Sequence, residues 1–329
     1  MAPLMMAKKS PKKGAPVAKG FGAKPTLAGK ASRIDSADSE RFFQWLKAGG
    51  ASVSKVAIAD FDGLRGVAAE KNIEEGEVIV SIPRDICLNL GSDGVNPGYA
   101  AAQLVRIEKD EERRRNGWFQ PFFDMLPKYE QCDTTEFYSE NELNALEWDA
   151  VIQETKSRVA MLRSTYEASQ VGLSNDIKFT WEEFLWGVYQ IVSRVLTIYT
   201  NEDGAVKYLI PMIDMFNHDA ASPHQLKATR DGLFQIIAGK KIFAGQQINF
   251  PYGGGNLNND RIIQDYGFVE SSNSHDVKQL LLPATSEPVQ GIPYVCMGLD
   301  AQGLEATLKR FSTTLDDDEI LLQKVGDMI

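Results

Sequence analysis

The chain has 329 residues, 43% of them hydrophobic, so it can build the core of one large domain or of two modest ones. It contains no continuous apolar run of the roughly 18 residues that a transmembrane helix needs, and no apolar stretch near its start of the kind found in signal peptides. Its three cysteines, Cys87, Cys132 and Cys296, are far apart. This spacing argues against a disulfide framework and a structural zinc cluster, and it favours a reducing compartment.

Charge is distributed unevenly along the chain. Residues 1–34 carry eight of the 35 Lys and Arg residues and no Asp or Glu, which leaves 27 basic against 45 acidic residues in the remainder. The remainder is therefore expected to repel nucleic-acid phosphates and to accept or attract a basic protein.

Residues 1–34 are rich in Lys, Ala, Gly and Pro and poor in large apolar side chains. Such a segment cannot bury enough surface to offset its ordering entropy, so the composition predicts a disordered basic tail. A plastid transit peptide is an alternative because the segment is basic and free of acids, although Lys outnumbers Arg and Ser is sparse. Contact of Ser10-Pro-Lys-Lys13 with a DNA minor groove is a third and weaker interpretation.

The elements predicted after the tail are a short amphipathic helix and a series of small strands. The helix covers residues 39–48, with its aromatic side chains facing inward, and Gly49-Gly50 ends it. Short strands separated by Gly, Asp and Asn clusters follow at residues 55–59, 66–69 and 78–82. The pattern is typical of small β elements and not of a βαβ alternation.

Residues 100–195 form a helical block in the sequence. Ser139 with Glu142, and Thr180 with Glu183, each fit a capping box, in which the hydroxyl and the carboxylate satisfy free backbone N–H groups at a helix start. Apolar residues recur at helical spacing after Thr180, so this last helix is expected to be largely buried.

Strand patterns return after residue 206. Asp231-Gly232 lies between two apolar runs and predicts a two-residue hairpin turn in which both residues take positive φ. The other elements expected here are strands at 227–230, 233–238 and 246–252, a helical segment at 259–265 and a helix candidate at 304–311.

Two compact motifs stand out in this part of the chain. The apolar run of residues 210–216 is interpreted as a strand that ends abruptly in Asn217-His218-Asp219, and Asp265-Tyr266-Gly267-Phe268 follows, with Tyr266 48 residues after His218. Taken singly, such His and Tyr residues are more often hydrogen-bonded core residues than catalytic groups. No metal is expected, because the spacing of the nearby ligand types matches no common template; these are Asp214, His218, Asp219 and His224.

The order and spacing of the motifs resemble SET domains of the Rubisco large-subunit methyltransferase class, which also contains an actin-histidine methyltransferase. The matching segments, in chain order, are Gly63-Leu-Arg-Gly-Val-Ala68, Ile73-x-x-Gly76-Glu77, Ile82-Pro83, Arg194, Asp214-Met-Phe-Asn-His218, Tyr252-Gly253, Tyr266-Gly-Phe268 and Asn273-Ser-His-Asp276. The resemblance covers roughly residues 40–280.

The resemblance implies an α+β fold: small curved β-sheets with a pseudoknot, interrupted by a helical insert and followed by a short C-terminal helical remnant. The implied division of the chain is a disordered basic tail at 1–34, the N-terminal part of the SET domain at 35–99, the helical insert at 100–195, and the C-terminal part with the catalytic motifs at 196–276. Residues 277–329 are then the start of a substrate-binding domain, and either this domain is shortened or the chain is a fragment.

The resemblance also implies a site for S-adenosylmethionine and a channel for the acceptor side chain. Tyr266 falls on the catalytic tyrosine of the family and Tyr252 on a tyrosine that lines the substrate channel. The implied cofactor contacts are Gly63, Leu64, Arg65, Arg194, Asp214, Asn217, His218, Tyr266, Gly267 and Phe268. The chain departs from the family at Gly63, where a Glu is frequent, and in the extra Gly and Asn residues at 253–259.

The implied activity is methyl transfer from S-adenosylmethionine to a lysine side chain of a non-histone protein. Such a reaction needs alignment, desolvation and a neutral amine, and a free lysine with a pKa of about 10.4 is neutral in only about one molecule in 10³ near pH 7. In this class a small residue in place of the tyrosine accompanies histidine acceptors, so Tyr266 favours lysine. The expected partner is a lysine-bearing protein, with neither nucleic acid nor a membrane; the oligomeric state is left open.

Two other functions remain as alternatives. One is a SET-like module that recognises a protein without modifying it. The other is a methyltransferase for DNA or small molecules, which is disfavoured because the glycine loop of Rossmann-type methyltransferases is missing and the chain is acidic. An intracellular location is expected, in a plastid or the cytoplasm in preference to the nucleus.

Overall fold

The computed structural model describes residues 31–92, 94, 96–114, 117–171, 178–200, 204–270 and 273. The helices of this part are α1 (Ala37–Ala48), α2 (Gly98–Arg114), α3 (Gln120–Phe123), α4 (Glu140–Ala145), α5 (Asp149–Gln170), α6 (Trp181–Arg194) and α7 (Asn259–Tyr266). The strands are β1 (Ser32–Arg33), β2 (Val56–Phe61), β3 (Leu64–Ala69), β4 (Val78–Pro83), β5 (Leu88–Ser92), β6 (Leu196–Thr200), β7 (Gly204–Leu209), β8 (Asn217–His218), β9 (Gln225–Ala228), β10 (Leu233–Ile237) and β11 (Gln247–Phe250).

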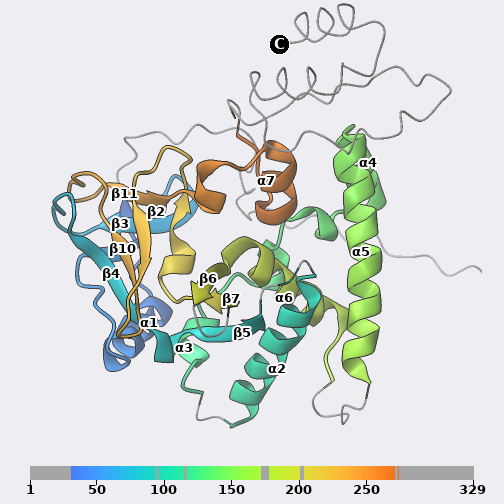
Figure 1. Ribbon diagram of the computed structural model, residues 1–329, viewed down its shortest axis with the longest axis horizontal. Helices are drawn as coiled ribbons and strands as arrows, with labels where there is room; N and C mark the ends of the chain where they lie inside the picture. The colour runs from blue at the N-terminus through green and yellow to red at the C-terminus, as the bar shows by residue number, and fades with distance from the viewer. Residues whose placement is uncertain are drawn as a thin grey trace, which may run out of the picture.

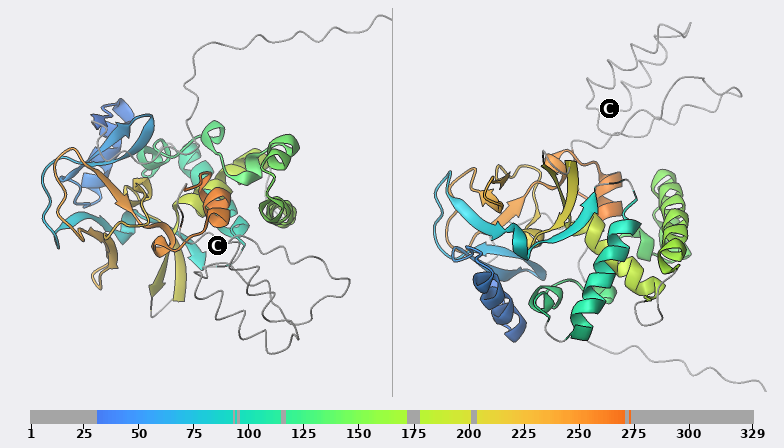
Figure 2. Two further views of the ribbon diagram at one scale, coloured as in Figure 1. Left: turned by 90° about the horizontal axis from the view of Figure 1, so that it is seen from above. Right: turned by 60° about the horizontal axis from the view of Figure 1, so that its bottom comes forward.

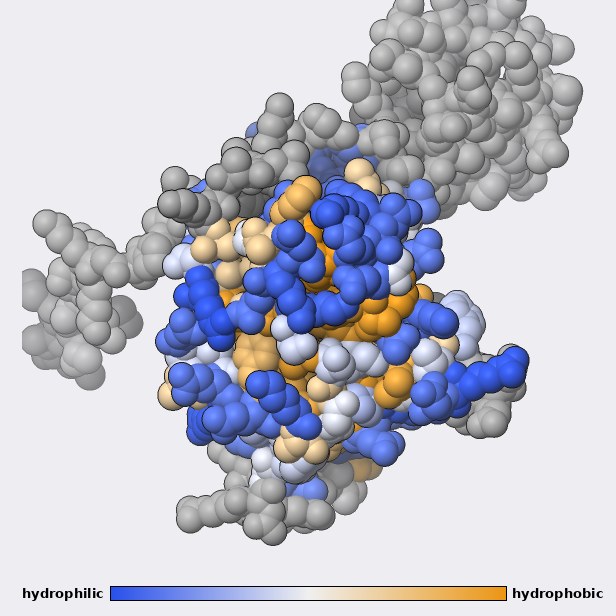
Figure 3. All heavy atoms as spheres, turned by 90° about the vertical axis from the view of Figure 1, so that its left-hand side faces the viewer, coloured by the Kyte–Doolittle hydropathy of each residue, from blue (hydrophilic) through white to orange (hydrophobic). Residues whose placement is uncertain are grey.

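The strands form three small sheets, in the orders β1-β2-β3-β11-β8, β4-β10-β9 and β5-β7-β6. Figure 1 shows the first two sheets on one side of the molecule, the β5-β7-β6 sheet near its middle, and α2, α5 and α6 on the other side, with α7 beside α5. The views in Figure 2 confirm this separation into a strand-rich and a helix-rich half. Hydrophilic residues cover much of the face at the sheet end, with apolar residues showing between them (Figure 3). The predicted α+β class with small sheets is confirmed.

The strand-rich half begins with a helix and a tight hairpin. Helix α1 starts two residues before the predicted position because Ser36 and Ser39 form a capping box around its first turn. Strands β2 and β3 are joined by Asp62 and Gly63 at φ 57° and 93°, and Phe61 pairs with Leu64. Two consecutive positive φ angles are the signature of a two-residue hairpin turn, which was not anticipated at this position.

The predicted turn at Asp231-Gly232 is wrong in detail. Only Gly232 takes positive φ, at 81°, and Phe234 pairs with Ala228. Thr229 N–H donates to the Leu233 carbonyl at 2.8 Å, and Gly232 N–H donates to the Thr229 carbonyl at 3.2 Å. The connection is therefore a longer loop with one left-handed glycine, a common alternative to the two-residue turn.

The helix-rich half follows the predicted caps. The Ser139–Glu142 and Thr180–Glu183 capping boxes both form, at the starts of α4 and α6. Helix α6 is buried along most of its length, and Phe184 is fully inaccessible. Because α6 packs against α2 and ends at Arg194, this buried helix fixes where that arginine enters the centre of the molecule.

The apolar run before Asn217 is not a strand, contrary to the prediction. Strand β7 ends at Leu209, and the chain then turns, with Met212 at φ 70° and Asp214 N–H donating to the Ile210 carbonyl at 3.0 Å. Pro211 has no N–H to give to a ladder, and Met212 and Phe216 are buried. Burial in a turn produces the same apolar run as burial in a sheet.

Several predictions concern the ends of the chain. Ser32 and Arg33, which were assigned to the tail by composition, pair with β2 as strand β1. Residues 1–30, the helix candidate at 304–311, the whole of 277–329 and all but the first residue of Asn273-Ser-His-Asp276 lie outside the described residues. None of the helices in the described part has the length and apolar content needed to cross a bilayer.

Candidate active site

The site is built where two short strands from distant parts of the chain meet. Strand β8 runs parallel to β11, with Asn217 opposite Asn249 and His218 opposite Phe250. The side-chain amide of Asn217 donates to the Arg65 carbonyl of β3 at 3.0 Å. A Cβ atom at the next residue, Gly66, would lie 2.6 Å from Asn217 Nδ2, so any other residue here would displace the Asn217 side chain from this position.

An aromatic cluster lies against this strand pair. Tyr252 N–H donates to His218 Nδ1 at 3.0 Å, and the Tyr252 hydroxyl donates to the Phe216 carbonyl at 2.7 Å. The ring of Tyr266 stacks on the ring of Tyr252, with centroids 4.6 Å apart and an angle of 28° between planes. Phe268 lies 6.0 Å from the His218 ring and 6.3 Å from the Tyr266 ring. The two sequence motifs therefore form one cluster.

Helix α7 delivers Tyr266 to this cluster. Asn258 caps the helix by accepting from Arg261 N–H, and Tyr266 is its last residue. Gly267 ends it in the left-handed conformation, at φ 77°. A Cβ atom at Gly267 would lie 2.5 Å from Asp133 Oδ1, so the glycine also makes room for that carboxylate. Asp133 thus packs on the Tyr-Gly-Phe motif.

Both tyrosines of the cluster are neutral phenols. Burial raises the pKa of Tyr266 well above its usual range, and the neighbouring Asp265 adds to the shift. Burial likewise raises the pKa of Tyr252 to about 12. Neither group is suited to act as a general base near neutral pH, because each holds its proton far above that pH.

Two arginines and one carboxylate lie beside the cluster. Arg194 Nη1 donates to the Asp214 carbonyl at 2.8 Å and lies 3.4 Å from Asp214 Oδ2. Burial, and secondarily the charge of Arg194, lowers the pKa of Arg65 to about 10. Burial raises the pKa of Asp214 against the opposing effect of the two guanidinium groups. The trio carries more positive than negative charge when ionised.

This trio retains hydrogen-bonding capacity. Arg194 Nε and Asp214 Oδ1 are buried and have no hydrogen-bond partner within the described part of the chain. Buried donors and acceptors without partners are costly in a folded protein. An acidic group bound next to Arg194 would satisfy the donor and balance the excess positive charge.

His218 is held between a backbone donor and a carboxylate. Its Nδ1 accepts from Tyr252 N–H, which places the proton of the neutral ring on Nε2, 3.4 Å from Glu270 Oε1. Burial lowers the pKa of His218, with Glu270 opposing the shift. Asn259 fixes the backbone of Glu270 by accepting from its N–H at 2.7 Å and donating to its carbonyl at 2.9 Å.

The buried state of His218 gives a pH-dependent stability. The unfolded chain has the ordinary pKa of 6.5, above the lowered pKa of the folded state. As the pH falls, the unfolded state therefore takes up the proton before the folded state does. The contribution of His218 to the unfolding free energy is fully present above pH 6.5, and it is lost as the pH falls from there through the folded-state pKa. In the His218→Gln variant the amide oxygen can still accept from Tyr252 N–H. We expect the pH slope of its unfolding free energy to decrease, by an amount that corresponds to at most about one proton taken up on unfolding.

The measurement is chemical denaturation at several pH values between about 7.5 and 5. His224→Gln is the matched control, because burial also lowers the pKa of His224 but its Nδ1 accepts from the remote Gly239 N–H at 3.1 Å. That control should retain the contribution of His218. A slope in His218→Gln equal to that of the parent protein would show that His218 titrates alike in both states.

Most of the expected site residues meet in this region, and two do not. Gly63 and Leu64 lie at the tip of the β2–β3 hairpin, and the Leu64 side chain is 56% exposed. Gly63 N–H donates to Asp60 Oδ1 at 3.0 Å, and Leu64 pairs with Phe61, so both residues are held within the hairpin itself. The hydrogen bond to β8 is made one residue further on, where the Arg65 carbonyl accepts from the Asn217 side chain.

Sequence reasoning also missed two groups at the site. Asp133 touches Gly267, and Glu270 lies next to His218. Asp133 comes from an irregular segment that gives no periodic signal. Glu270 lies two residues after Phe268 and could have been considered from the sequence, but only the structure shows that its carboxylate lies next to His218.

The family model described as SET domain matches residues 64–253, more than half of the chain. Among similar proteins, "[Fructose-bisphosphate aldolase]-lysine N-methyltransferase, chloroplastic" of Arabidopsis thaliana is 28% identical over 260 residues, covering 70% of this chain and 52% of its own. "Ribulose-1,5 bisphosphate carboxylase/oxygenase large subunit N-methyltransferase, chloroplastic" of Pisum sativum is 25% identical, with 76% and 55% covered. "Actin-histidine N-methyltransferase" of Homo sapiens is 24% identical, with 71% and 42% covered.

The chain thus spans about half the length of the curated relatives it matches. Among solved structures, "Structure of Rubisco LSMT bound to AdoMet" superposes with a TM-score of 0.59 at 23% identity, covering 73% of this chain and 58% of that one. "Crystal structure of the SET domain of LSMT bound to Lysine and AdoHcy" gives the same TM-score at 21% identity, with 71% and 57% covered. These structures share the fold, and the matched residues include strand β8 with Asn217 and His218, and Tyr252 just after β11: the chain belongs to the SET-domain family.

Proposed function

We propose that the chain is an S-adenosylmethionine-dependent methyltransferase that modifies a lysine side chain of a non-histone protein. The observation that carries the proposal is the stack of Tyr266 on Tyr252, with Tyr252 bonded to both His218 and the Phe216 carbonyl. This stack joins the tyrosine motif to the Asn-His motif. In the family such a junction separates a cofactor site from a channel for the acceptor.

The residues beside the stack fit the cofactor. S-adenosylmethionine supplies a methyl group on a positively charged sulfur and carries an amino-acid carboxylate. Arg194 offers an unpartnered Nε donor beside a group of side chains with excess positive charge, which suits that carboxylate. Asn217 and His218 border the same region from β8. We assign cofactor binding to Arg65, Arg194, Asp214, Asn217, His218 and the Tyr266-Gly-Phe268 motif, with Gly63 and Leu64 as more peripheral candidates.

The chain's own groups would align and desolvate the acceptor. Tyr266 and Tyr252 remain neutral, so they do not remove the proton of the amine. Their rings form an apolar wall beside the acceptor, and each ring carries one hydroxyl oxygen. Desolvation by this wall favours the neutral amine, because burial lowers the pKa of a lysine. The Tyr266 oxygen can accept weak hydrogen bonds from a polarised methyl group and so hold it in line with the nitrogen.

Lysine is preferred to histidine as the acceptor because Tyr266 is present. The aldolase relative is named for lysine and the actin relative for histidine, so the names alone leave both acceptors open. A plastid or the cytoplasm is the proposed compartment, since the plant relatives are named as chloroplast proteins. The division into a tail at 1–34, a SET core interrupted by an insert at 100–195, and a further domain from 277 stays a prediction.

Cofactor binding is the first test. S-adenosylmethionine at about 100 times its dissociation constant should raise the unfolding free energy by about 2.7 kcal/mol, measured as an upward shift in the thermal midpoint. The decarboxylated analogue should stabilise the protein less, because it lacks the group assigned to Arg194. Absence of any shift at millimolar cofactor would favour the alternative of a protein-binding module without activity.

Methyl transfer is the second half of this test. Incubation of the protein with cell extract and methyl-labelled cofactor, followed by mass spectrometry, should identify methylated lysine on a non-histone protein. Methylated histidine would keep the methyltransferase class and overturn the choice of acceptor. Cofactor binding without any labelled protein would leave the binding module as the better description.

A further inference from the structure

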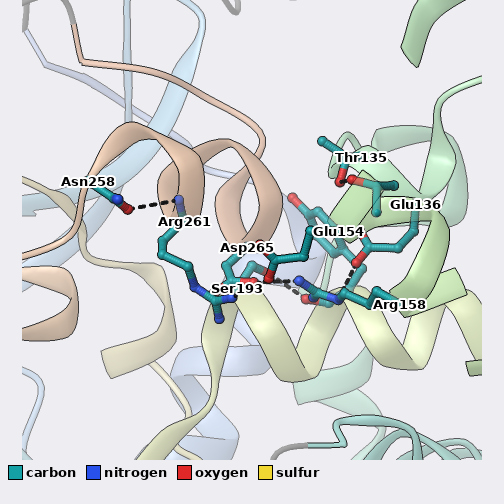
Figure 4. A network of polar contacts seen from close by, with 10 residues as sticks. Thr135, Glu136, Glu154, Arg158, Ser193, Asn258, Arg261 and Asp265 are labelled. Carbon is teal, nitrogen blue, oxygen red and sulfur yellow. Dashed lines mark hydrogen bonds and ion pairs between the residues drawn. The ribbon is translucent and has the colours of Figure 1, made fainter. Parts of the chain in front are cut away.

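An ion-pair network joins helix α5 to helix α7 on the side of the site away from the sheets. Arg158 of α5 lies between two carboxylates: its Nε is 2.5 Å from Glu136 Oε1, and its Nη1 donates to Asp265 Oδ1 at 2.8 Å. Figure 4 shows the guanidinium group placed between Glu136 and Asp265. The Glu136 side chain is completely inaccessible, and the Arg158 side chain is 10% exposed. The network is therefore buried at its centre.

A second arginine completes the attachment of α7. Arg261 Nη2 donates to Asp265 Oδ2 at 2.8 Å, one helical turn away, and Arg261 Nη1 donates to Glu154 Oε1 of α5 at 3.2 Å. Both oxygens of Asp265 are thus occupied by guanidinium groups. The side chains of Arg261 and Glu154 are each 39% exposed. Their ion pair is therefore screened by water and is weaker than the contact made by Arg158.

Helix α7 depends on such contacts for its position. It has eight residues, too few for a stable isolated helix, and its buried apolar side chains are Ile262 and Ile263. Asp265 immediately precedes Tyr266. Because the two residues share a backbone, a rotation or shift of α7 that breaks the Asp265–Arg158 contact also moves the Tyr266 ring against Tyr252.

Because Glu136 is buried, this network fixes the arrangement of α5 and α7 more than it adds to the stability of the fold. Burial raises the pKa of Glu136, while the Glu136 and Asp265 carboxylates together outweigh burial and raise the pKa of Arg158. Removing buried ions from water costs about as much as their attraction returns, so such a pair adds little net stability. It does penalise every arrangement of α5 and α7 in which the charges separate.

We propose that Arg158, held by the buried Glu136, is a positioning residue for Tyr266: it fixes α7 against α5 and thereby sets the place of the Tyr266 hydroxyl relative to the reacting atoms. This inference rests on the proposed function, because it presumes the role of Tyr266. The proposal gives the helical segment 100–195 a part in the chemistry, through the contacts of Arg158 with Glu136 and Asp265.

Kinetics provide the first test. Arg158→Met keeps the side-chain length without the charge, and we expect kcat to fall roughly 10- to 100-fold, the loss that a misplacement of about 1 Å produces. The dissociation constant of S-adenosylmethionine should stay within about threefold. Because Glu136 would then be buried without its cation, the double variant Glu136→Gln/Arg158→Met is made in parallel and should show the same kcat loss with a better-behaved fold.

The matched control is Arg163→Met on the same helix. The Arg163 guanidinium lies 3.7 Å from the centre of the Trp181 ring, so its removal also costs stability, but this contact is made with α6. Its kcat should equal that of the parent protein at a temperature where both are folded. Equal kcat in Arg158→Met and Arg163→Met would overturn the proposal.

A spectroscopic readout tests the inference without turnover. Fluorotyrosine placed at position 266 gives a ¹⁹F resonance that senses the stacked Tyr252 ring. We expect this resonance to shift or broaden in Arg158→Met and in the double variant, and to stay unchanged in Arg163→Met. An unchanged resonance in all variants would refute positioning. An inactive parent protein with the expected resonance changes would count against the proposed function and still support the role of Arg158 in placing Tyr266.

Discussion

Tyr266→Phe is expected to lower the rate of methyl transfer by at least about 100-fold, the effect typical of removing one polar contact aimed at the reacting group. The substitution deletes a single hydroxyl and keeps the ring that stacks 4.6 Å from Tyr252. The fold and the shape of the site are therefore retained. What is lost is the oxygen that would hold the methyl group in line with the acceptor nitrogen.

The measurement separates this effect from binding. The dissociation constant of S-adenosylmethionine should remain within about threefold, and the loss should appear in kcat and not only in KM. Tyr252→Phe is the informative comparison, because its hydroxyl is committed to the Phe216 carbonyl and its loss removes a structural bond as well. A Tyr266→Phe enzyme with full turnover would remove that residue from the chemistry.

Arg194→Met should weaken binding of S-adenosylmethionine by about 10- to 100-fold, the value of a hydrogen bond to a charged partner. The guanidinium is held by the Asp214 carbonyl and carboxylate, and its Nε has no partner in the described part of the chain. Removing it also leaves the fully buried Asp214 with a poorer counter-charge, so a stability loss of up to about 3 kcal/mol is expected alongside.

Discrimination against the decarboxylated cofactor distinguishes these two effects. The parent protein should bind S-adenosylmethionine more tightly than the analogue without a carboxylate, and Arg194→Met should bind the two more nearly alike. Arg194→Lys retains the charge and loses the planar fork, so it should recover part of the affinity. If the variant lost stability yet kept the full preference for the carboxylate, Arg194 would be a partner of Asp214 alone.

The sequence predicted well where local chemistry decides the structure. Both capping boxes formed because a hydroxyl and a carboxylate three residues apart satisfy the same backbone donors wherever they occur. Two of the Asp-Gly pairs in the sequence show the limit of such rules. Asp62-Gly63 makes the tight turn, whereas Asp231-Gly232 is part of a longer loop, because strand pairing beyond the dipeptide selects the turn.

The site itself was predicted only in outline. The motif order grouped Asn217, His218, Tyr252 and Tyr266, and in the structure these residues lie close together. It gave no sign that the preceding apolar run is a buried turn, that Asp133 packs on Gly267, or that Arg158 and Glu136 hold α7. Each of these contacts joins residues far apart in the chain, and a single sequence carries no periodic signal for such a pairing.

The bond from the Asn217 side chain to the Arg65 carbonyl spans 152 positions, and the ion pair between Arg158 and Asp265 spans 107. Contacts of such high sequence separation form late, after the entropy of closing long loops has been overcome, and chains dominated by them fold slowly. The helices α2, α5 and α6 can gain structure before the aromatic cluster around Tyr266 is assembled. During refolding, affinity for the methyl donor should therefore emerge with the last kinetic phase, well after most helical signal has returned.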